Sequence, residues 1–369
     1  MNITTVEHCA GCLACQAVCP KKCISTTHDA IGHVQPVVDS DICIDCSLCS
    51  KICPEITPLE LSPMQQVYAA WDKNEEARKK SSSGGLASLI SQQVIKEGGV
   101  VYGSAFQPPL NITHTRCDSI EALEKLRGSK YVQSDTGGCW KQLRADIKEG
   151  KKVLFIGTPC QVAAARRICK ESEMLYTIDL ICHGVPSMEM IKKSLPASID
   201  YAQIANITFR DSTDFKIKIL DNENKTIYTR PLHKDWYLKG FFTALFYRDS
   251  CYNCKYAKGD RIGDITLGDF WGVKESVINT DTDNGISAVC VNTDKGGRLV
   301  ESIHTQVNIV ERDVAEVKKE NKPLNHPSKK SIRTNLFKKL IRIFKFNTAV
   351  KLCLPEITIK SYITSIIKR

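Results

Sequence analysis

Eight cysteines within the first 53 residues have the spacing of iron–sulfur ligands. Two phrases of identical form, Cys-x-x-Cys-x-x-Cys-x-x-x-Cys-Pro, begin 34 residues apart, at Cys9 and at Cys43. Thiolates in this order bind cubane clusters, and the fourth cysteine of each phrase ligates the cluster of the other phrase. The pattern predicts two 4Fe-4S clusters, with the ligand sets Cys9, Cys12, Cys15 and Cys53 for one and Cys43, Cys46, Cys49 and Cys19 for the other.

This double phrase is the one found in bacterial ferredoxins, so we expect residues 1–57 to form an α+β ferredoxin-like domain with two clusters. A pair of zinc sites is the alternative, although zinc modules usually separate their C-x-x-C pairs by longer loops. Cys23 lies outside both phrases, and we interpret it as a packed small hydrophobe rather than a ligand. The proline-rich segment 54–64 is expected to be a linker to the rest of the chain.

Four further cysteines form a candidate third site. Residues 152–157 have the pattern of a buried strand, and a tight turn and a helix over Gln161–Cys169 follow. Cys160 therefore lies between a strand end and a helix start, where the helix dipole favours a thiolate. Cys182 leaves a second strand, 175–181, and parallel pairing would bring both thiols to the ligand-binding edge of an open sheet. A C-x-x-C pair completes the set of Cys160, Cys182, Cys251 and Cys254. Buried structural cysteines, a zinc site and a redox-active C-x-x-C are the alternatives.

Two loops rich in glycine and serine are candidate ligand contacts. Ser83-Gly84-Gly85 opens a helix that extends to Gly98, and the free backbone N–H groups at such a start suit a phosphate. A plain serine cap with a glycine turn explains the same residues. The second loop, residues 127–134, combines a glycine, cations, a ring and hydroxyls. It is compatible with an anionic or aromatic ligand and with an ordinary solvated loop.

The net charge of +10 is concentrated near the C-terminal end. Residues 322–369 hold 12 Lys and Arg against one acid, whereas residues 1–321 have a net charge of −1. The neutral body argues against a nucleic-acid-binding protein. Five apolar residues recur at helical spacing among the cations of the tail: Ile332, Leu336, Leu340, Ile343 and Phe344. They predict a basic amphipathic helix within the tail, residues 321–369. Such a helix lies on an anionic membrane surface or an acidic partner, or packs on its own domain.

Eighteen cysteines without a signal peptide indicate a reducing compartment. No apolar run approaches the ~18 residues that a membrane-spanning helix requires. We therefore expect a cytoplasmic protein whose basic tail brings it into peripheral contact with a membrane. A secreted disulfide scaffold is disfavoured, because such scaffolds are short and carry a signal peptide.

Six phrases between residues 65 and 275 together resemble the beta subunits of coenzyme F420 hydrogenase/dehydrogenase. Relatives of this kind include the F420H2 dehydrogenase subunit that carries its own ferredoxin domain, and 7-hydroxymethyl chlorophyll a reductase. The phrases are Ser83-Gly84-Gly85, Gly128-Ser129-Lys130-Tyr131-Val132, Gly157-Thr158-Pro159-Cys160-Gln161, Cys182-His183-Gly184-Val185-Pro186, Cys251-x-x-Cys254 and Gly263-Asp264-x-x-x-Gly268-Asp269.

The resemblance implies an α/β catalytic domain with a mixed sheet over residues 65–320 that binds FAD and a further 4Fe-4S cluster. By matching phrase, the ligands of that cluster would be Cys160, Cys182, Cys251 and Cys254. The flavin contacts would be Ser83, Gly84, Gly85, Gly128, Ser129, Lys130, Tyr131 and Ser134. His183, beside one of these cysteines, is a candidate for donating a proton or a hydrogen bond, and a structural role is its alternative.

The expected function is that of an iron–sulfur flavoprotein oxidoreductase that passes electrons between 4Fe-4S clusters and FAD, to or from an organic substrate. A reduced deazaflavin is one candidate substrate. A polysaccharide-pathway intermediate is another, because bacterial proteins resembling this chain occur with polysaccharide-synthesis enzymes. The alternative is a non-catalytic electron-transfer subunit that docks a partner oxidoreductase. We expect a redox partner protein such as ferredoxin or a dehydrogenase subunit.

Overall fold

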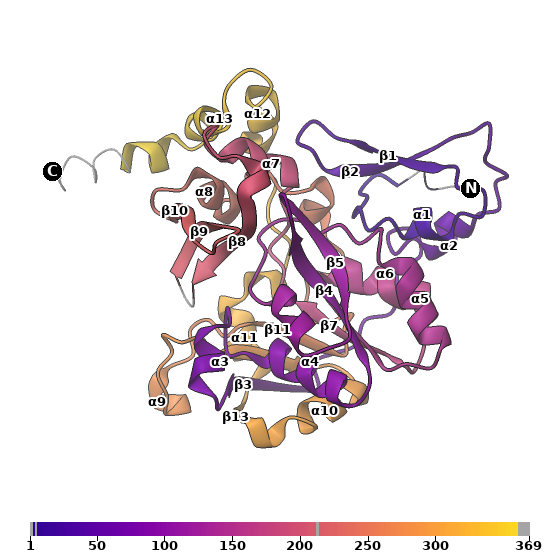
Figure 1. Ribbon diagram of the computed structural model, residues 1–369, viewed down its shortest axis with the longest axis vertical. Helices are drawn as coiled ribbons and strands as arrows, with labels where there is room; N and C mark the ends of the chain where they lie inside the picture. Colours follow the sequence, from indigo (N-terminus) through magenta and orange to yellow (C-terminus); the bar gives the residue numbers. More distant parts are fainter. Residues whose placement is uncertain (1–2, 4–5, 212–213, 361–369) are drawn as a thin grey trace.

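Apolar runs of five to eight residues form the strands of an eight-stranded mixed sheet, the largest element of the computed structural model (Figure 1). The structure describes residue 3, residues 6–211 and residues 214–360. The strand order is β13-β3-β12-β11-β7-β6-β4-β5. The strands are β3 (Gln66–Asp72), β4 (Val100–Gln107), β5 (Asn111–Cys117), β6 (Val153–Gly157), β7 (Leu175–Leu180), β11 (Ile265–Asp269), β12 (Ser287–Val291) and β13 (Val307–Arg312).

The centre of this sheet is parallel, and its flanks are antiparallel. Strands β4, β6, β7 and β11 pair in parallel, whereas β5, β12, β3 and β13 pair antiparallel with their neighbours. Helices cover both faces, because central strands of a parallel sheet are apolar on both sides. The helices of this unit are α3 (Glu75–Lys79), α4 (Leu86–Lys96), α5 (Trp140–Lys148), α6 (Pro159–Cys169), α9 (Glu275–Ile278), α10 (Asp294–Glu301) and α11 (Val314–Glu320).

Two apolar cores lie on opposite faces of the sheet. Helices α4 and α10 pack on one face, where Ile90 and Leu299 meet Val101 and Ile178. Helices α5 and α6 pack on the other face, around the fully buried Trp140. Single-turn 3-10 helices link several elements, at Glu121–Leu126, Tyr201–Gln203, Asp249–Asn253, His304–Gln306 and Lys322–Leu324.

A second, smaller unit combines residues from the middle and the end of the chain. It contains a three-stranded antiparallel sheet of order β10-β9-β8 and four helices with one common core. Its elements are α7 (Met188–Ser194), β8 (Ile204–Asp211), β9 (Asp214–Asp221), β10 (Thr226–Pro231), α8 (Trp236–Phe242), α12 (Ile332–Leu340) and α13 (Phe346–Cys353). The buried rings of Phe246, Phe337 and Phe346 contact one another, so the tail is part of this core.

The tail differs from the single amphipathic helix that its periodicity predicts. It forms two helices, and the residues it buries include Phe337, Ile341 and Val350. The predicted apolar stripe is instead mostly solvent-exposed, with Ile332 88% and Ile343 75% accessible. The prediction failed because the chain turns after Ile341, so a helical pattern drawn across the turn joins residues of two different helices.

The N-terminal segment forms a separate module beside the large sheet, at the opposite side of the molecule from the chain's end (Figure 1). It consists of two short helices and an antiparallel hairpin: α1 (Ala14–Val18), β1 (Ile24–His28), β2 (Val34–Val38) and α2 (Leu48–Ile52). Cysteines provide much of its small core, which includes Cys15, Cys23 and Cys49. In the part of the chain that the structure describes, no helix is both long enough and apolar enough to cross a membrane.

Candidate iron–sulfur and ligand site

The turn after β6 presents Cys160 at the start of α6. Thr158 is the N-cap of this helix and forms a capping box with Gln161, whose side-chain oxygen accepts from the Thr158 N–H at 3.0 Å. The Thr158 hydroxyl lies 3.3 Å from the Cys160 sulfur. Strand β7 pairs in parallel with β6, and Cys182 follows its end, so the predicted parallel arrangement is confirmed.

The structure brings Cys160, Cys182, Cys251 and Cys254 into one partly buried group. Burial raises the pKa of Cys182 well above its ordinary value, and the charges of Cys251, Cys160 and Cys254 raise it further. Burial also raises the pKa of Cys160 to about 12. The expectation that the helix dipole favours a thiolate at Cys160 is therefore wrong for the thiol by itself, because desolvation outweighs it. Thiolates in this group need a compensating cation, such as iron.

The first N-terminal ligand set is also grouped. Burial raises the pKa of Cys12, and the charges of Cys9, Cys15 and Cys53 contribute to the rise. The turn that carries this set is bound to the large sheet unit, because the Cys12 carbonyl accepts from Trp140 Nε1 at 2.8 Å and from the Thr136 hydroxyl at 2.9 Å.

The second N-terminal set lines one small pocket at the outer end of the module. The four thiols share this pocket with Cys23, whose sulfur lies 3.4 Å from that of Cys19. Cys23 is buried in the module core, as its interpretation as a packed residue requires, but it also borders the pocket. In the described residues, no three Cys, His, Asp or Glu side chains form a group that could hold a single metal ion.

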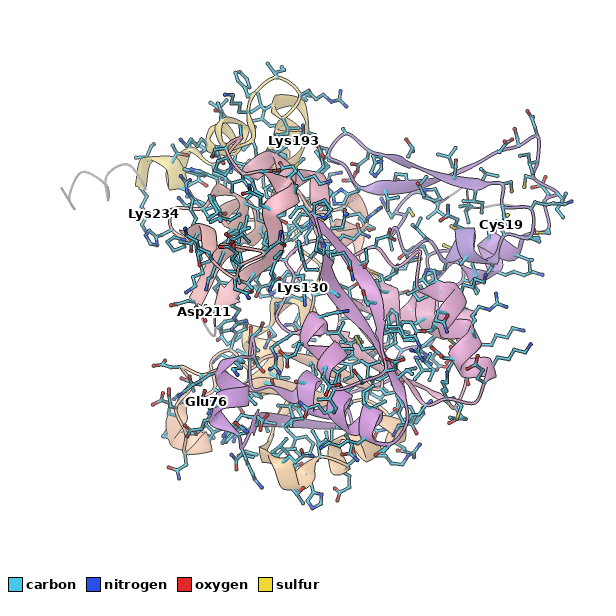
Figure 2. All side chains as sticks on the ribbon, in the orientation of Figure 1. Cys19, Glu76, Lys130, Lys193, Asp211 and Lys234 are labelled. Carbon is cyan, nitrogen blue, oxygen red and sulfur yellow. The ribbon has the colours of Figure 1, made fainter. Side chains whose placement is uncertain are left out.

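A cavity of about 340 Å³ opens beside the Cys160 group, between the large sheet and the three-stranded sheet. Lys130 is one of its lining residues, and Figure 2 shows this lysine near the middle of the molecule. The wall includes both glycine–serine loops, Cys160, Cys182 and His183. The two loops contact each other, since the Ser129 N–H donates to the Ser82 hydroxyl at 2.8 Å. Two polar atoms in the lining, Ser104 Oγ and Arg127 Nη1, are buried without any hydrogen-bond partner among the described residues.

Seven of the eight predicted flavin contacts line this cavity: Ser83, Gly85, Gly128, Ser129, Lys130, Tyr131 and Ser134. Gly84 does not, because it packs against the backbone of β3, where an added Cβ would lie 2.3 Å from the Ala70 carbonyl. The hydroxyl of Ser83 donates to the Ile286 carbonyl, and that of Ser134 is bound by His114 and Gln161. These two serines therefore contribute to the shape of the wall more than to its free polar groups.

Two ionisable side chains on the cavity wall are desolvated. Burial lowers the pKa of Lys130 to about 7, while its Nζ donates to the carbonyls of Leu126 and Arg127, both at 2.8 Å. Desolvation likewise lowers the pKa of His183 below its usual value, although part of this side chain faces solvent in the open cavity. The His183 ring is therefore neutral at pH 7.

Sequence reasoning missed the far wall of the cavity, which consists of aromatic rings around an ion pair. Arg210 Nη1 lies 2.6 Å from Asp269 Oδ2, and its guanidinium lies over the rings of Phe215 and Trp271. Tyr131 contacts Phe215 from the other loop. Arg210 and Asp269 lie 59 residues apart, on different sheets, so spacing gave no signal. A planar ligand fits such a wall, because aromatic faces stack on planar rings.

A buried ion pair positions the segment that carries the C-x-x-C. Arg261 Nη2 donates to Asp179 Oδ1 at 2.8 Å, with both side chains nearly inaccessible. Arg261 Nη1 also donates to the carbonyls of Tyr256 and Lys258, just after Cys254. The arginine thereby ties this segment to the end of β7, next to Cys182. This is the part of the predicted Gly263-Asp264 region whose role is structural.

Three comparisons with known proteins bear on this arrangement. Residues 150–317 match the family model described as the C terminus of the coenzyme F420 hydrogenase/dehydrogenase beta subunit. The F420H2 dehydrogenase protein of Methanosarcina mazei that is designated its F subunit is 23% identical over 332 residues, which cover 83% of this chain and 86% of that protein. The chain belongs to the family of coenzyme F420 hydrogenase/dehydrogenase beta subunits.

Further relatives cover either most of the chain or its N-terminal module alone. An uncharacterized protein of Methanocaldococcus jannaschii is 24% identical over 337 residues, 79% of this chain and 85% of its own length. A chain of the F420-reducing [NiFe] hydrogenase complex from Methanosarcina barkeri shares the fold, with a TM-score of 0.50 and 19% identity over 72% of this chain and 91% of its own. The ferredoxin 7Fe of Hydrogenibacillus schlegelii is 39% identical over 56 residues, 15% of this chain and 65% of the ferredoxin.

These findings confirm the family prediction and the large mixed sheet. They support iron–sulfur clusters and an electron-transfer role in an oxidoreductase of this family. The similarity to 7-hydroxymethyl chlorophyll a reductase stays a prediction.

Proposed function

We propose that this chain is an iron–sulfur flavoprotein oxidoreductase with three 4Fe-4S clusters and FAD. The ligands of the clusters would be the three cysteine sets described above. The observation that carries the proposal is the cavity itself, because its wall includes both Cys160 and Cys182 and the two glycine–serine loops. A ligand in this cavity would lie directly against the third cysteine group.

The residues around the cavity fit a flavin. Arg127 Nη1 and Ser104 Oγ are buried polar atoms in need of partners, and Gly85 caps the start of the 11-residue helix α4. These donors suit the phosphates of a dinucleotide. The aromatic wall around Arg210 suits a planar ring. A bound flavin would supply the coupling of one-electron to two-electron chemistry.

The protein's own residues would bind and orient the ligands of the cavity. His183 has a neutral ring at pH 7, so it can accept a proton at a ring nitrogen or donate from the other one. Arg210 and Asp269 offer a donor and an acceptor at the far wall. For the organic substrate we propose a reduced deazaflavin or an intermediate of a polysaccharide pathway, both of which contain rings and polar groups.

Anaerobic purification followed by analysis of iron, acid-labile sulfide and flavin tests this proposal. We expect about twelve irons per chain and release of FAD on denaturation. Fewer than about eight irons would refute even the two N-terminal clusters. A protein with full iron content that releases no flavin would refute the FAD. The variant Cys251→Ala should retain about eight irons, and Cys290→Ala, which removes a buried cysteine outside the three sets, should retain all of them.

The alternative is a non-catalytic electron-transfer subunit that docks a partner oxidoreductase. The name of the Methanosarcina mazei relative, a dehydrogenase subunit, favours it. Under this alternative a redox partner, such as a ferredoxin or a dehydrogenase subunit, would complete the reaction. Oxidation of reduced deazaflavin by the isolated chain, with a dye as acceptor, supports the enzyme. Activity that appears only with an added partner protein supports the alternative.

We also propose peripheral contact of the cytoplasmic protein with an anionic membrane through the tail. The exposed residues Ile332 and Ile343 lie beside exposed cations that include Lys339 and Arg342. Apolar insertion and attraction to anionic lipid act together at such a surface. The variant Ile332→Ser/Ile343→Ser should lose sedimentation with phosphatidylserine vesicles, whereas the control Val277→Ser, at an exposed residue of α9, should retain it. Equal binding by both variants would refute the contact.

A further inference from the structure

Arg248 is a buried arginine between the N-terminal module and the rest of the chain. Only 1% of its surface is accessible. Its guanidinium donates to Gln133 Oε1 at 3.0 Å, to the Cys9 carbonyl at 2.9 Å and to the Val34 carbonyl. Two of these acceptors belong to the module, and the third belongs to the cavity loop. The side chain thus joins two units that are far apart in the sequence.

The contact is close enough to need a glycine. A Cβ added to Gly11, whose φ is +67°, would lie 2.2 Å from Arg248 Nη2. Gln133 closes the arrangement from the other side, because its Nε2 donates to the Ala10 carbonyl at 2.9 Å. The Cys9–Cys12 turn is therefore held in place by an arginine and a glutamine that also bind each other.

Arg248 also lies next to the third cysteine group. Its N–H donates to the Val185 carbonyl at 3.0 Å, and its carbonyl accepts from the Cys251 N–H at 2.9 Å. Burial raises the pKa of Cys251 and of Cys160, and the positive charge of Arg248 opposes both rises. One buried cation therefore faces two cysteine sets at the same time.

The charge of Arg248 has no carboxylate partner among the described residues. Two other arginines with deeply buried side chains differ in this respect, since Arg210 pairs with Asp269 and Arg261 with Asp179. Burial of a charge without a counter-charge is strongly unfavourable, even with neutral hydrogen-bond acceptors. Thiolate-ligated iron–sulfur clusters are anionic, so clusters on either side would provide the missing negative charge.

We propose that Arg248 is a positioning residue that docks the Cys9–Cys12 turn beside the Cys160 group and compensates the negative charge of the clusters at both sets. The inference rests on the proposed iron–sulfur function. It also orders the sets, because the Cys43 set lies at the outer end of the module and has no contact with Arg248 in the described structure. The Cys43 set thus serves as an internal reference.

Redox titration monitored by EPR, on the anaerobically purified full chain, tests this role. Removal of a nearby positive charge makes reduction of an anionic cluster harder. In Arg248→Gln we therefore expect more negative midpoint potentials for two clusters, an unchanged potential for the third, and weaker magnetic coupling between the shifted pair. Arg78→Gln is the matched control, because Arg78 is also buried and donates to backbone carbonyls away from the module. Its potentials should equal those of the wild type.

Arg248→Lys separates charge from geometry and covers the case in which Arg248→Gln does not fold. Lysine retains the charge but cannot reach three acceptors at once. We expect potentials close to wild type with reduced coupling. Wild-type potentials and coupling in Arg248→Gln, or unchanged coupling in Arg248→Lys when it alone folds, would overturn the inference. A wild-type chain with fewer than about twelve irons would instead refute the proposed function, so the two failures are distinguishable.

Discussion

The ion pair between Arg261 and Asp179 gives the sharpest test of how the third site is built. Both side chains are nearly inaccessible, at 2% and 0%. Loss of one partner of a buried pair leaves an uncompensated charge and costs about 3–5 kcal/mol. In Arg261→Met the Asp179 carboxylate would still accept the N–H groups of Ile262 and Gly263, at 3.2 and 2.9 Å. Because these bonds stabilise the remaining charge, we expect the lower end, about 3 kcal/mol.

Thermal unfolding followed by circular dichroism measures this loss. A stability change of about 3 kcal/mol corresponds to a Tm decrease of roughly 6–12 °C for a domain of this size. The segment after Cys254 would also lose its tether, so we expect the iron content to fall from about twelve to about eight per chain. Lys193→Gln, which breaks an exposed pair with Glu189, is the control and should cost no more than about 1 kcal/mol.

A double variant separates lost charge balance from lost hydrogen bonds. Asp179→Asn/Arg261→Gln removes both charges but retains an amide oxygen for the two backbone N–H groups. It should recover part of the stability lost in Arg261→Met, as coupled neighbours do. A Tm within about 2 °C of the wild type and an unchanged iron content in Arg261→Met would refute the reasoning.

Three further outcomes are expected. Burial lowers the pKa of His114 to about 4 from about 6.5 in the unfolded chain, so the free energy of unfolding should fall by about 2 kcal/mol between pH 7 and pH 5; chemical denaturation should show a smaller fall in His114→Gln. Cys19→Ala should retain its cluster by ligand exchange with Cys23, whereas Cys19→Ala/Cys23→Ala should lose about four irons; equal iron content in the two would contradict this. Gly184→Ala should destabilise the loop after Cys182, because φ is +134° and the added Cβ would lie 2.3 Å from the Tyr247 ring; a wild-type Tm would argue against it.

The parallel strands and their cysteines could be predicted from the sequence because their signals are local. An apolar run, a turn and a helical pattern place Cys160 at a strand end without any knowledge of distant residues. The cysteine phrases are equally local, since each places three of its four thiols within seven residues. Parallel pairing of β6 and β7 then followed from the chain order of strand, helix and strand, and the register agrees.

The far wall of the cavity and the tail could not be predicted because their contacts are long-range. Arg210 gains its meaning only from Asp269 and Trp271, which belong to a different part of the chain. The tail misled for another reason: the residues that pack, such as Phe337, belong to a core shared with α8, while the regular stripe remains exposed. Periodicity indicates which residues lie on one face of a helix, but not which face another segment covers.

The hydrogen bonds that fix the Cys9–Cys12 turn to the body have a consequence for how the chain handles electrons. A separate ferredoxin meets its acceptor by diffusion, and the rate of that encounter falls as either protein is diluted. Here the carrier is tethered and also docked, so the local concentration of one site about the other is set by the fold and not by expression level. Only the outer end of the module remains for an exchange that depends on concentration.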